Sequence, residues 1–442
     1  MLRKQAFIER IRENLWFWPV VTAIVSVGLA YLLAQVGPLD DTPVDPLLVD
    51  VSAGSVRSLL ATLLAAMVTA SSVVASLTIV ALQTASTQFS PRLLRNFIRD
   101  GSTQFVLAYF VGTSGLLVTL TIEADDDTAR VAVTVAFVAV LLSVVVIAYF
   151  FNHVSQSIRV ESIMHTVMSE ACEAVERLDH WLATGVPCAD DADRIPPAAG
   201  PVTASRSGYV QQIDSALLGR IAVDYGVDVH VVPQLGQAVT TGVPFAWTWP
   251  AAGEAQTLSP EVANSVASEI RGAFEVGYER TMHHDVGLGL RQLVDMSIKA
   301  MSPAVNDPYT SMQAVDHLAT ILVRLGRVQL DDHAWPPNGP FRVVVPVASF
   351  SEFAELACDQ LRAYGGRDAA VRSRLMMMLR DVATAVPAEH HRVLRRLVVD
   401  CGDSSIAMDH ERDRRRVDEV RDEVLEWFDH RIEPRHALRG GL

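Results

Sequence analysis

The sequence predicts an α-helical membrane protein in which four transmembrane helices precede a cytoplasmic α+β region, made of a small β-rich domain and a helical domain. Half of the 442 residues are hydrophobic, and the mean hydropathy of +0.24 is high for a soluble protein. Apolar residues crowd the first third of the chain and charged residues the last third. The length also exceeds the usual size of a single hydrophobic core. We expect a transmembrane domain over 1–154, a connecting helix and linker over 155–200, a small β-rich domain over 201–255 and a mostly helical domain over 256–442.

Four apolar segments, residues 15–36, 56–82, 103–122 and 131–151, are each close to the roughly 20 helical residues that cross a bilayer. Trp16 and Trp18 stand where an aromatic belt would lie. A cleaved signal peptide is the rival interpretation of the first segment. Its apolar run exceeds the 7–15 residues or so of the hydrophobic region of a signal peptide, and no clear small-residue cleavage motif follows. We therefore interpret it as a retained anchor.

Charged loops predict the orientation of these spans. Basic residues precede the first span, separate the second from the third and follow the fourth, while the other two loops are acidic. The positive-inside rule then places both the N- and C-termini in the cytoplasm, in a multi-pass protein of the bacterial inner membrane. The basic residues are Arg3, Lys4, Arg10, Arg12, Arg92, Arg95, Arg99 and Arg159; the acidic ones are Asp40, Asp41, Asp45, Asp50, Glu123, Asp125, Asp126 and Asp127.

The second span carries polar residues on one helical face, since they recur at steps of three, four and seven. A face of hydroxyls and amides is costly against lipid, so it should meet protein or water. Two interpretations stay open: tight helix packing through small residues, or the lining of a pore completed by neighbouring subunits. The span holds no carboxylate, which argues against a carboxylate proton relay. The pore-lining candidates are Thr62, Thr69, Ser72, Ser76, Gln83 and Thr87. The helix should continue past Leu82 as far as Ser90.

A basic amphipathic helix is predicted just after this span. Arg92, Arg95 and Arg99 share one face of "SPRLLRNFIRDG". Such a face most simply contacts anionic lipid headgroups at the cytoplasmic surface. A vestibule that concentrates anions is the alternative.

The cytoplasmic half begins with a helix near 155–184 and a Pro- and Gly-containing linker over 184–208. Short β-branched runs then predict a β-domain, whose Gly236 and Gly242 resemble a hairpin corner of biotinyl or lipoyl carriers. No lysine lies between Lys4 and Lys299, which argues against a covalent carrier. Helices follow from Ser259, an expected N-cap. The run "PFRVVVPVAS" is expected to be an isolated or edge strand, before helices near 351–363, 367–385 and 388–400. A last helix of mixed charge should be solvated or bridge subunits.

Motifs for chemistry are weak throughout the chain. The net charge of −14 argues against nucleic-acid binding. The four cysteines have no CxxC spacing and fit a reducing compartment. His283 and His284 are adjacent, so on a helix they would point about 100° apart and could not both ligate one metal ion. No known catalytic or phosphate-binding motif is found. We expect no enzyme activity, cofactor or metal.

The segment "KAMSPAVNDPYTSMQAVDHL", residues 299–318, interrupts an amphipathic helix with two prolines. Pro303 should end one helix, and Asp307 should cap the next with Pro308 in its first turn. Thr310 can reach back to the cap, while Asn306 tolerates turn geometry. The segment is interpreted as a rigid corner between helices, with a binding site as the alternative.

The stretches "RTMHHDVGLGLRQLVDMSIKAMSPAVNDPYTSMQAVDHL", "STQFSPRLLRNFIRD" and "SGYVQQID" resemble the bacterial predicted-membrane-protein family known as domain of unknown function 2254. The resemblance covers nearly the whole chain and implies four spans and a cytoplasmic C-terminal region, without implying a function. Residues that match the family pattern are Arg280, Thr281, Asp285, Arg291, Asp295, Ser302, Pro303, Asn306, Asp307, Pro308 and Thr310.

The polar face, the basic segment and the missing enzyme motifs together favour an oligomeric inner-membrane ion channel or channel-like transporter whose second span lines the pathway. The expected partners are the lipid bilayer, further copies of the chain and possible ions, but not nucleic acid. The alternative is a non-transporting, membrane-anchored sensor or scaffold with a cytoplasmic domain that binds a ligand or partner. That alternative predicts binding near Asp285, Arg291, Asn306 and Asp307.

Overall fold

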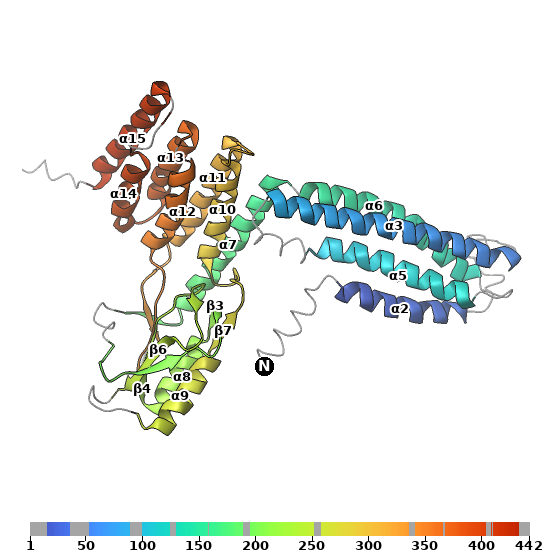
Figure 1. Ribbon diagram of the computed structural model, residues 1–442, viewed down its shortest axis with the longest axis horizontal. Helices are drawn as coiled ribbons and strands as arrows, with labels where there is room; N and C mark the ends of the chain where they lie inside the picture. The colour runs from blue at the N-terminus through green and yellow to red at the C-terminus, as the bar shows by residue number, and fades with distance from the viewer. Residues whose placement is uncertain are drawn as a thin grey trace, which may run out of the picture. The chain divides into compact units, whose positions relative to one another are not determined.

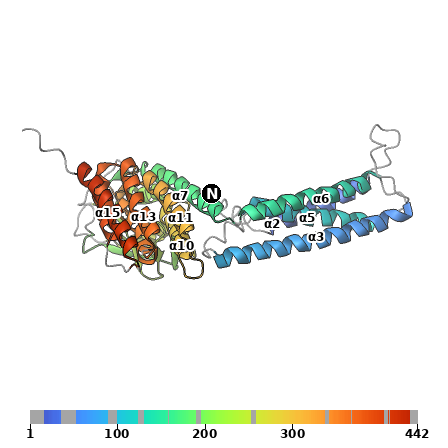
Figure 2. The same ribbon diagram turned by 90° about the horizontal axis from the view of Figure 1, so that it is seen from above.

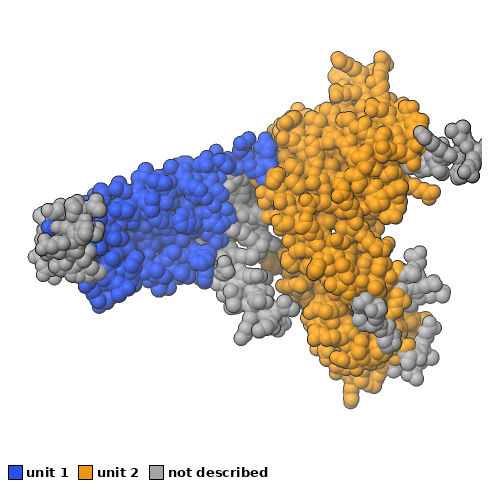
Figure 3. All heavy atoms as spheres, turned by 180° about the vertical axis from the view of Figure 1, so that it is seen from behind, with its two compact units in different colours: residues 1–162 blue, residues 163–442 orange. Residues whose placement is uncertain are grey.

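The computed structural model describes residues 16–35, 53–88, 100–123, 130–157, 159–188, 195–251, 258–335, 341–365, 367–403, 408 and 410–432. The chain divides into two compact units, Met1–Ser162 and Ile163–Leu442, which are coloured separately in Figure 3. The first unit is helical within the described residues, and the second combines helices with two β-sheets.

The described residues of the first unit form four helices, α2 (Phe17–Ala34), α3 (Ala53–Gln88), α5 (Gly101–Glu123) and α6 (Arg130–Ser157), which lie side by side in Figures 1 and 2. All four are long and apolar enough to cross a membrane. They coincide with the four predicted segments, and α3 continues past Leu82 as expected. Valine, leucine and isoleucine dominate the outward surfaces of α2, α5 and α6, as in helices that contact lipid.

Close packing of α2 on α5 depends on small residues. A side chain added at Gly112 would place its Cβ 3.0 Å from Ser26 Oγ and 3.3 Å from Thr22 Cβ. The missing side chain lets the helix backbones approach, as is common between membrane helices. Thr22 Oγ1 also donates a hydrogen bond of 2.9 Å to the Ala108 carbonyl across this interface.

The second unit contains a six-stranded and a three-stranded sheet. The larger has the order β1 (Val186–Pro187), β8 (His333–Trp335), β9 (Val343–Val345), β4 (Val227–Val231), β6 (Pro244–Pro250) and β2 (Gly200–Thr203). The smaller has the order β5 (Ala238–Val239), β3 (Gly208–Ile213) and β7 (Phe274–Gly277). The sheets thus include strands from outside residues 201–255.

Strand β9 corrects one expectation, because it is neither isolated nor at an edge. It lies between β8, to which it is antiparallel, and β4, to which it is parallel. All three of its valines are buried, as in strands covered on both faces. A run of valines is typical of a buried strand. Its partner β4 lies more than 100 residues earlier in the chain, so the run itself does not indicate the pairing.

Helices surround the sheets and form the rest of the unit. α8 (Ser215–Tyr225) is capped by Asp214, and α9 (Pro260–Gly272) is capped by the predicted Ser259, whose hydroxyl accepts from Val262 N. α7 (Val160–Leu182) precedes the sheets. The remaining helices are α10 (Val286–Ala300), α11 (Pro308–Leu325), α12 (Phe350–Gly365), α13 (Ala369–Ala385), α14 (His391–Cys401) and α15 (Glu411–Ile432).

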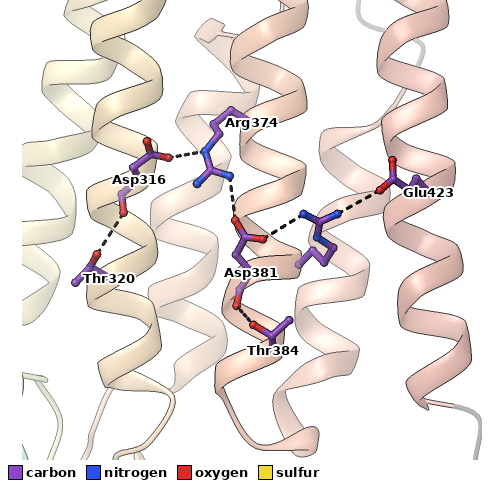
Figure 4. Close-up of polar contacts among 7 residues, drawn as sticks. Asp316, Thr320, Arg374, Asp381, Thr384 and Glu423 are labelled. Carbon is purple, nitrogen blue, oxygen red and sulfur yellow. Dashed lines mark hydrogen bonds and ion pairs between the residues drawn. The ribbon is translucent and has the colours of Figure 1, made fainter.

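A row of ion pairs joins α11, α13 and α15. Figure 4 shows Arg374 between Asp316 on α11 and Asp381 on its own helix α13. Arg380 continues the row from Asp381 to Glu423 on α15, at 3.4 and 3.3 Å. The side chains are partly exposed, so each pair stabilises the fold by about 1 kcal/mol or less. The mixed charges of the last helix therefore serve, in part, to align it within its own chain.

Candidate functional site

Helix α3 carries two seams of side chains that run in parallel. The first has alternating steps of four and three residues and faces the interior of the first unit. A second seam with the same steps begins two residues later, about 200° around the helix, and is exposed. We call these the inner seam (Val56, Leu60, Leu63, Met67, Ala70, Val74, Leu77 and Ala81) and the outer seam (Ser58, Thr62, Ala65, Thr69, Ser72, Ser76, Ile79 and Gln83).

Five of the six predicted pore-lining candidates belong to the outer seam, and the side chain of the sixth, Thr87, lies outside the described residues. The outer seam is small and mostly polar, whereas the inner seam is apolar. The polar face therefore points away from the other helices of its unit, toward whatever surrounds α3. Within a single chain, the described part of unit 1 does not enclose a pathway along this face.

Three hydroxyls of the outer seam have partners within their own helix. Thr62, Thr69 and Ser72 donate to the carbonyls four residues earlier, at 2.8, 2.9 and 2.9 Å. Such bonds reduce the cost of placing a hydroxyl against lipid or a neighbouring helix. The face is consequently compatible with contact to water, to lipid or to a neighbouring helix.

The predicted basic helix, with Arg92, Arg95 and Arg99, lies outside the described residues. The next described residue, Asp100, caps α5 by accepting from Thr103 N at 2.8 Å and from Thr103 Oγ1 at 2.7 Å. It also contacts His153 Nε2 on α6 at 2.7 Å. Burial raises the pKa of the Asp100 carboxyl, but the bonds from Thr103 and His153 outweigh burial and hold it below its usual value. This end of α5 is thereby fixed to α6.

The corner between α10 and α11 has the predicted construction. Asp307 caps α11 by accepting from Thr310 N at 3.1 Å and Thr310 Oγ1 at 2.6 Å, with Pro308 in the first turn. These bonds lower the pKa of the Asp307 carboxyl. Asn306 is the one described non-glycine residue with a positive φ, 48°. Ser302 accepts at its carbonyl from Val305 N and Asn306 N, which closes the turn. The corner is solvent-accessible within its unit.

A buried contact behind this corner was not predicted. Ser297 and Ser311 are fully buried and their Oγ atoms are 2.6 Å apart, which joins α10 to α11. Neither residue breaks the helical pattern, so no signal in the sequence pointed to the contact.

The other motif residues form separate ion pairs along α10. Arg280 donates from Nε and Nη2 to the two oxygens of Asp285, both at 2.7 Å. Asp285 is 5% exposed and also caps α10 through Leu288 N. Arg291 pairs with Asp295 at 2.8 Å, one helical turn apart.

The motif residues therefore do not converge on one small ligand. Asp285 and the corner lie at opposite ends of α10, which has 15 residues and so a length of about 22 Å. The single site expected near Asp285, Arg291, Asn306 and Asp307 would have to span that length.

Gly236 contributes to the Asp285 cluster, a role that its hairpin pattern did not reveal. Its φ is +79°, and an added Cβ would lie 2.1 Å from Asp285 Oδ2. Glycine is thus required both by the backbone conformation and by the close carboxylate. Among the described residues no cluster of three or more His, Cys, Asp or Glu side chains could hold a metal ion.

The comparisons with known proteins agree with this architecture. The model of the family DUF2254, described as "Predicted membrane protein", matches residues 12–381. Uncharacterized protein Mb1321c of Mycobacterium bovis and uncharacterized protein Rv1290c of Mycobacterium tuberculosis are each 32% identical over 395 residues, covering 86% of this chain and 74% of theirs. No solved structure matches the chain. The chain is therefore a membrane protein that belongs to the DUF2254 family.

Proposed function

We propose that the chain forms an oligomeric ion channel or channel-like transporter of the bacterial inner membrane, without enzymatic activity, in which the outer seams of α3 from several subunits surround a common axis. Both termini would lie in the cytoplasm. The single observation that carries the proposal is the exposed outer seam, because a polar face turned away from its own helical unit calls for a partner or for water.

The composition of the outer seam supports contact between copies of α3. Small side chains let helix backbones approach closely, and a period of 3.5 residues is the one that left-handed helix packing requires. Thr69 and Ser72, near the middle of the span, are both exposed. Neighbouring copies would present the hydroxyls of these side chains toward the axis. There, rotation of the side chains away from the helix carbonyls would let the hydroxyls contact ions or water.

Cysteine cross-linking tests the assembly. Thr69→Cys, in a chain whose native cysteines are replaced by alanine, should form disulfide-linked dimers in membranes. Val144→Cys, at a 65% exposed position on α6, is the matched control and should remain monomeric. Equal cross-linking of the two variants would contradict an assembly through α3.

Ion flux in proteoliposomes tests conduction. Potassium and chloride salts should each be assayed, with Thr69→Trp as a blocking variant and Val144→Trp as its control. We expect flux that Thr69→Trp reduces at least tenfold and Val144→Trp leaves unchanged. Cross-linking without flux in any salt would refute the channel and leave the second candidate.

The second candidate is a non-transporting, membrane-anchored sensor or scaffold. It is favoured by the hydroxyls of Thr62, Thr69 and Ser72, whose bonds to their own helix need no water-filled path. In that case the outer seam would serve only in helix packing, and activity would reside in the second unit.

A further inference from the structure

The corner between α10 and α11 turns apolar side chains toward solvent. Residues 303–306 are all exposed, as is Tyr309 in the first turn of α11. Val305 is 51% exposed and Tyr309 65%. The turn holds both side chains there, because Asp307 caps α11 and Asn306 adopts the positive φ of the turn. Single exposed apolar residues are common on soluble proteins, so the position of the corner decides what this surface contacts.

Helix α10 lies against α7 and runs in the opposite direction. A Cβ added at Gly289 would be 2.5 Å from the Cβ of Ala171, so the two helices are in contact there. Just before α10, the His283 carbonyl accepts from Arg177 Nε at 2.7 Å. Residue numbers therefore rise along α7 as they fall along α10. The C-terminal end of α10 consequently lies beside the N-terminal end of α7.

Helix α11 begins at the same end. The rings of His317 on α11 and His165 on α7 are 6.4 Å apart, and Arg324 Nη1 lies 2.6 Å from Glu176 Oε1 further along both helices. α11 therefore runs parallel to α7, and its first turn, at Pro308, lies beside the first turns of α7 (Figure 1). The corner, which joins α10 to α11, is consequently level with the start of α7.

The start of α7 is held close to the membrane by the chain itself. The apolar span of α6 ends at Gln156, and α7 begins at Val160. Four residues reach at most about 14 Å when fully extended, and neighbouring helix axes are roughly 8–10 Å apart. Whatever direction α7 takes, the corner is then within about 25 Å of the point where α6 leaves the membrane. So short a connection raises the effective concentration of the corner at the bilayer, and even a weak affinity keeps it there.

The composition of the corner suits a bilayer surface. Tyrosine is enriched where a membrane meets water, because its ring is apolar and its hydroxyl is polar. Val305 adds an apolar side chain in the turn. Over residues 299–310 the charged side chains are Lys299, which is exposed, and Asp307, whose carboxylate already accepts from Thr310. One positive and one negative charge balance, so neither sign of headgroup repels the corner as a whole.

We infer that the corner between α10 and α11 is a membrane-contact surface, at which Val305 and Tyr309 insert into the headgroup region of the bilayer that α6 crosses. This contact gives a role to the family motif at 302–308, because its cap and turn hold both side chains outward. The inference goes beyond the proposed function and applies equally to a channel and to an anchored scaffold. A second attachment, besides the chain itself, would limit the motion of the second unit against the bilayer.

Lipid-borne quenchers test the contact in the full-length chain. Tyr309→Cys and Val305→Cys, each in a chain whose native cysteines are replaced by alanine, are labelled with a nitrobenzoxadiazole fluorophore and reconstituted in phosphatidylcholine vesicles. Val399→Cys is the matched control, because Val399 is 44% exposed on α14, the helix on the far side of α12 from α10 (Figure 1).

A nitroxide attached to the lipid near its headgroup should quench both corner labels roughly threefold more strongly than the control, since interfacial side chains are buried roughly 5–10 Å into that region. The two corner positions report independently, so one suffices if the other variant does not fold. Equal quenching at the corner and at Val399→Cys would overturn the inference.

Aqueous iodide distinguishes lipid from protein as the partner of the corner. Contact with lipid should protect the corner labels from iodide while the nitroxide lipid quenches them. Protection from iodide without quenching by the lipid would show that a protein, such as a second copy of the chain, covers the corner, and would refute the membrane contact. Free access of iodide to the corner labels would refute it as well.

Charged substitutions test the two side chains themselves. A label at Ala304→Cys reports on the corner while Val305 and Tyr309 are both replaced by glutamate. Quenching by the nitroxide lipid should fall to the control level, because a carboxylate is costly to take out of water. Val399→Glu with Tyr364→Glu, a valine and a tyrosine exposed elsewhere in the second unit, should leave the quenching unchanged. Quenching that persists without Val305 and Tyr309 would overturn the role of these side chains. All these assays measure contact with lipid, so their failure leaves the channel proposal untouched.

Discussion

Replacement of Gly236 by alanine should destabilise the second unit far more than the same change at Gly242. The two glycines have nearly the same backbone conformation, with φ of +79° and +81°. Alanine in this region costs roughly 1–2 kcal/mol at either position. Around Gly242 nothing lies within 4 Å of the added Cβ, whereas at Gly236 that atom would be 2.1 Å from Asp285 Oδ2.

The difference in stability between the two variants follows from the hydrogen bonds that Asp285 would lose. Moving its carboxylate would weaken the cap on α10, worth about 1 kcal/mol. It would also disturb two charge-assisted bonds from Arg280, each worth roughly 1.5–3 kcal/mol when well buried. Arg280 is 30% exposed, so we take the lower end for these bonds. Gly236→Ala should then be less stable than Gly242→Ala by about 4 kcal/mol, or roughly 8 °C in midpoint temperature.

Thermal and urea unfolding of the full-length variants, followed by tryptophan fluorescence, measures this difference. A third variant sharpens the test, because Asp285→Ala removes the carboxylate with which the new Cβ collides. In that background Gly236→Ala should cost no more than Gly242→Ala. Equal stability of the two single variants, or an unchanged difference in the Asp285→Ala background, would refute the reasoning.

Three further predictions concern other positions. His284→Phe should flatten the pH dependence of the free energy of unfolding. The folded-state pKa of about 4 lies below the usual 6.5, so the unfolded chain binds the proton first and wild-type stability falls by about 2 kcal/mol from pH 7 to pH 5. Unfolding curves at both pH values measure this loss, and a variant that loses as much stability as the wild type would contradict the prediction. Asp307→Ala should lower stability by about 1 kcal/mol through loss of the α11 cap, an effect that Asp307→Asn should largely avoid in urea titrations. Gly112→Leu should separate α2 from α5, because Ser26 Oγ is 3.0 Å from the new Cβ. In detergent, a protease should cleave this variant faster than Gly28→Leu, whose added Cβ has no neighbour within 4 Å.

The spans and the corner could be predicted because their signals are local. Four apolar runs of sufficient length indicate four membrane helices, and the described part of the structure has four helices long and apolar enough to cross a membrane. At the corner, Asp307, Pro308 and Thr310 lie within four residues of one another, so cap chemistry alone determined their roles. Asn306 similarly tolerates the positive φ that it adopts.

Contacts between distant segments could not be predicted in this way. The parallel pairing of β4 with β9 joins Val229 to Val343, and a run of valines does not name its neighbour. The cluster of Gly236, Arg280 and Asp285 likewise joins two loops that are far apart in the sequence. The polar pattern of the second span predicted a shared face, but only packing revealed that this face is opposite the inner seam.

The two seams of α3 also bear on the order in which the protein assembles. Since the inner seam, together with Leu59 and Leu64, holds α3 within its unit, a second copy could bind the outer seam without displacing these contacts. Folding of a subunit and association of subunits would then be separate steps, with a folded monomer as a stable intermediate in the bilayer. The shared period of 3.5 residues gives both faces a left-handed twist. A neighbouring α3 would therefore cross at about 20°, the angle common in helical bundles.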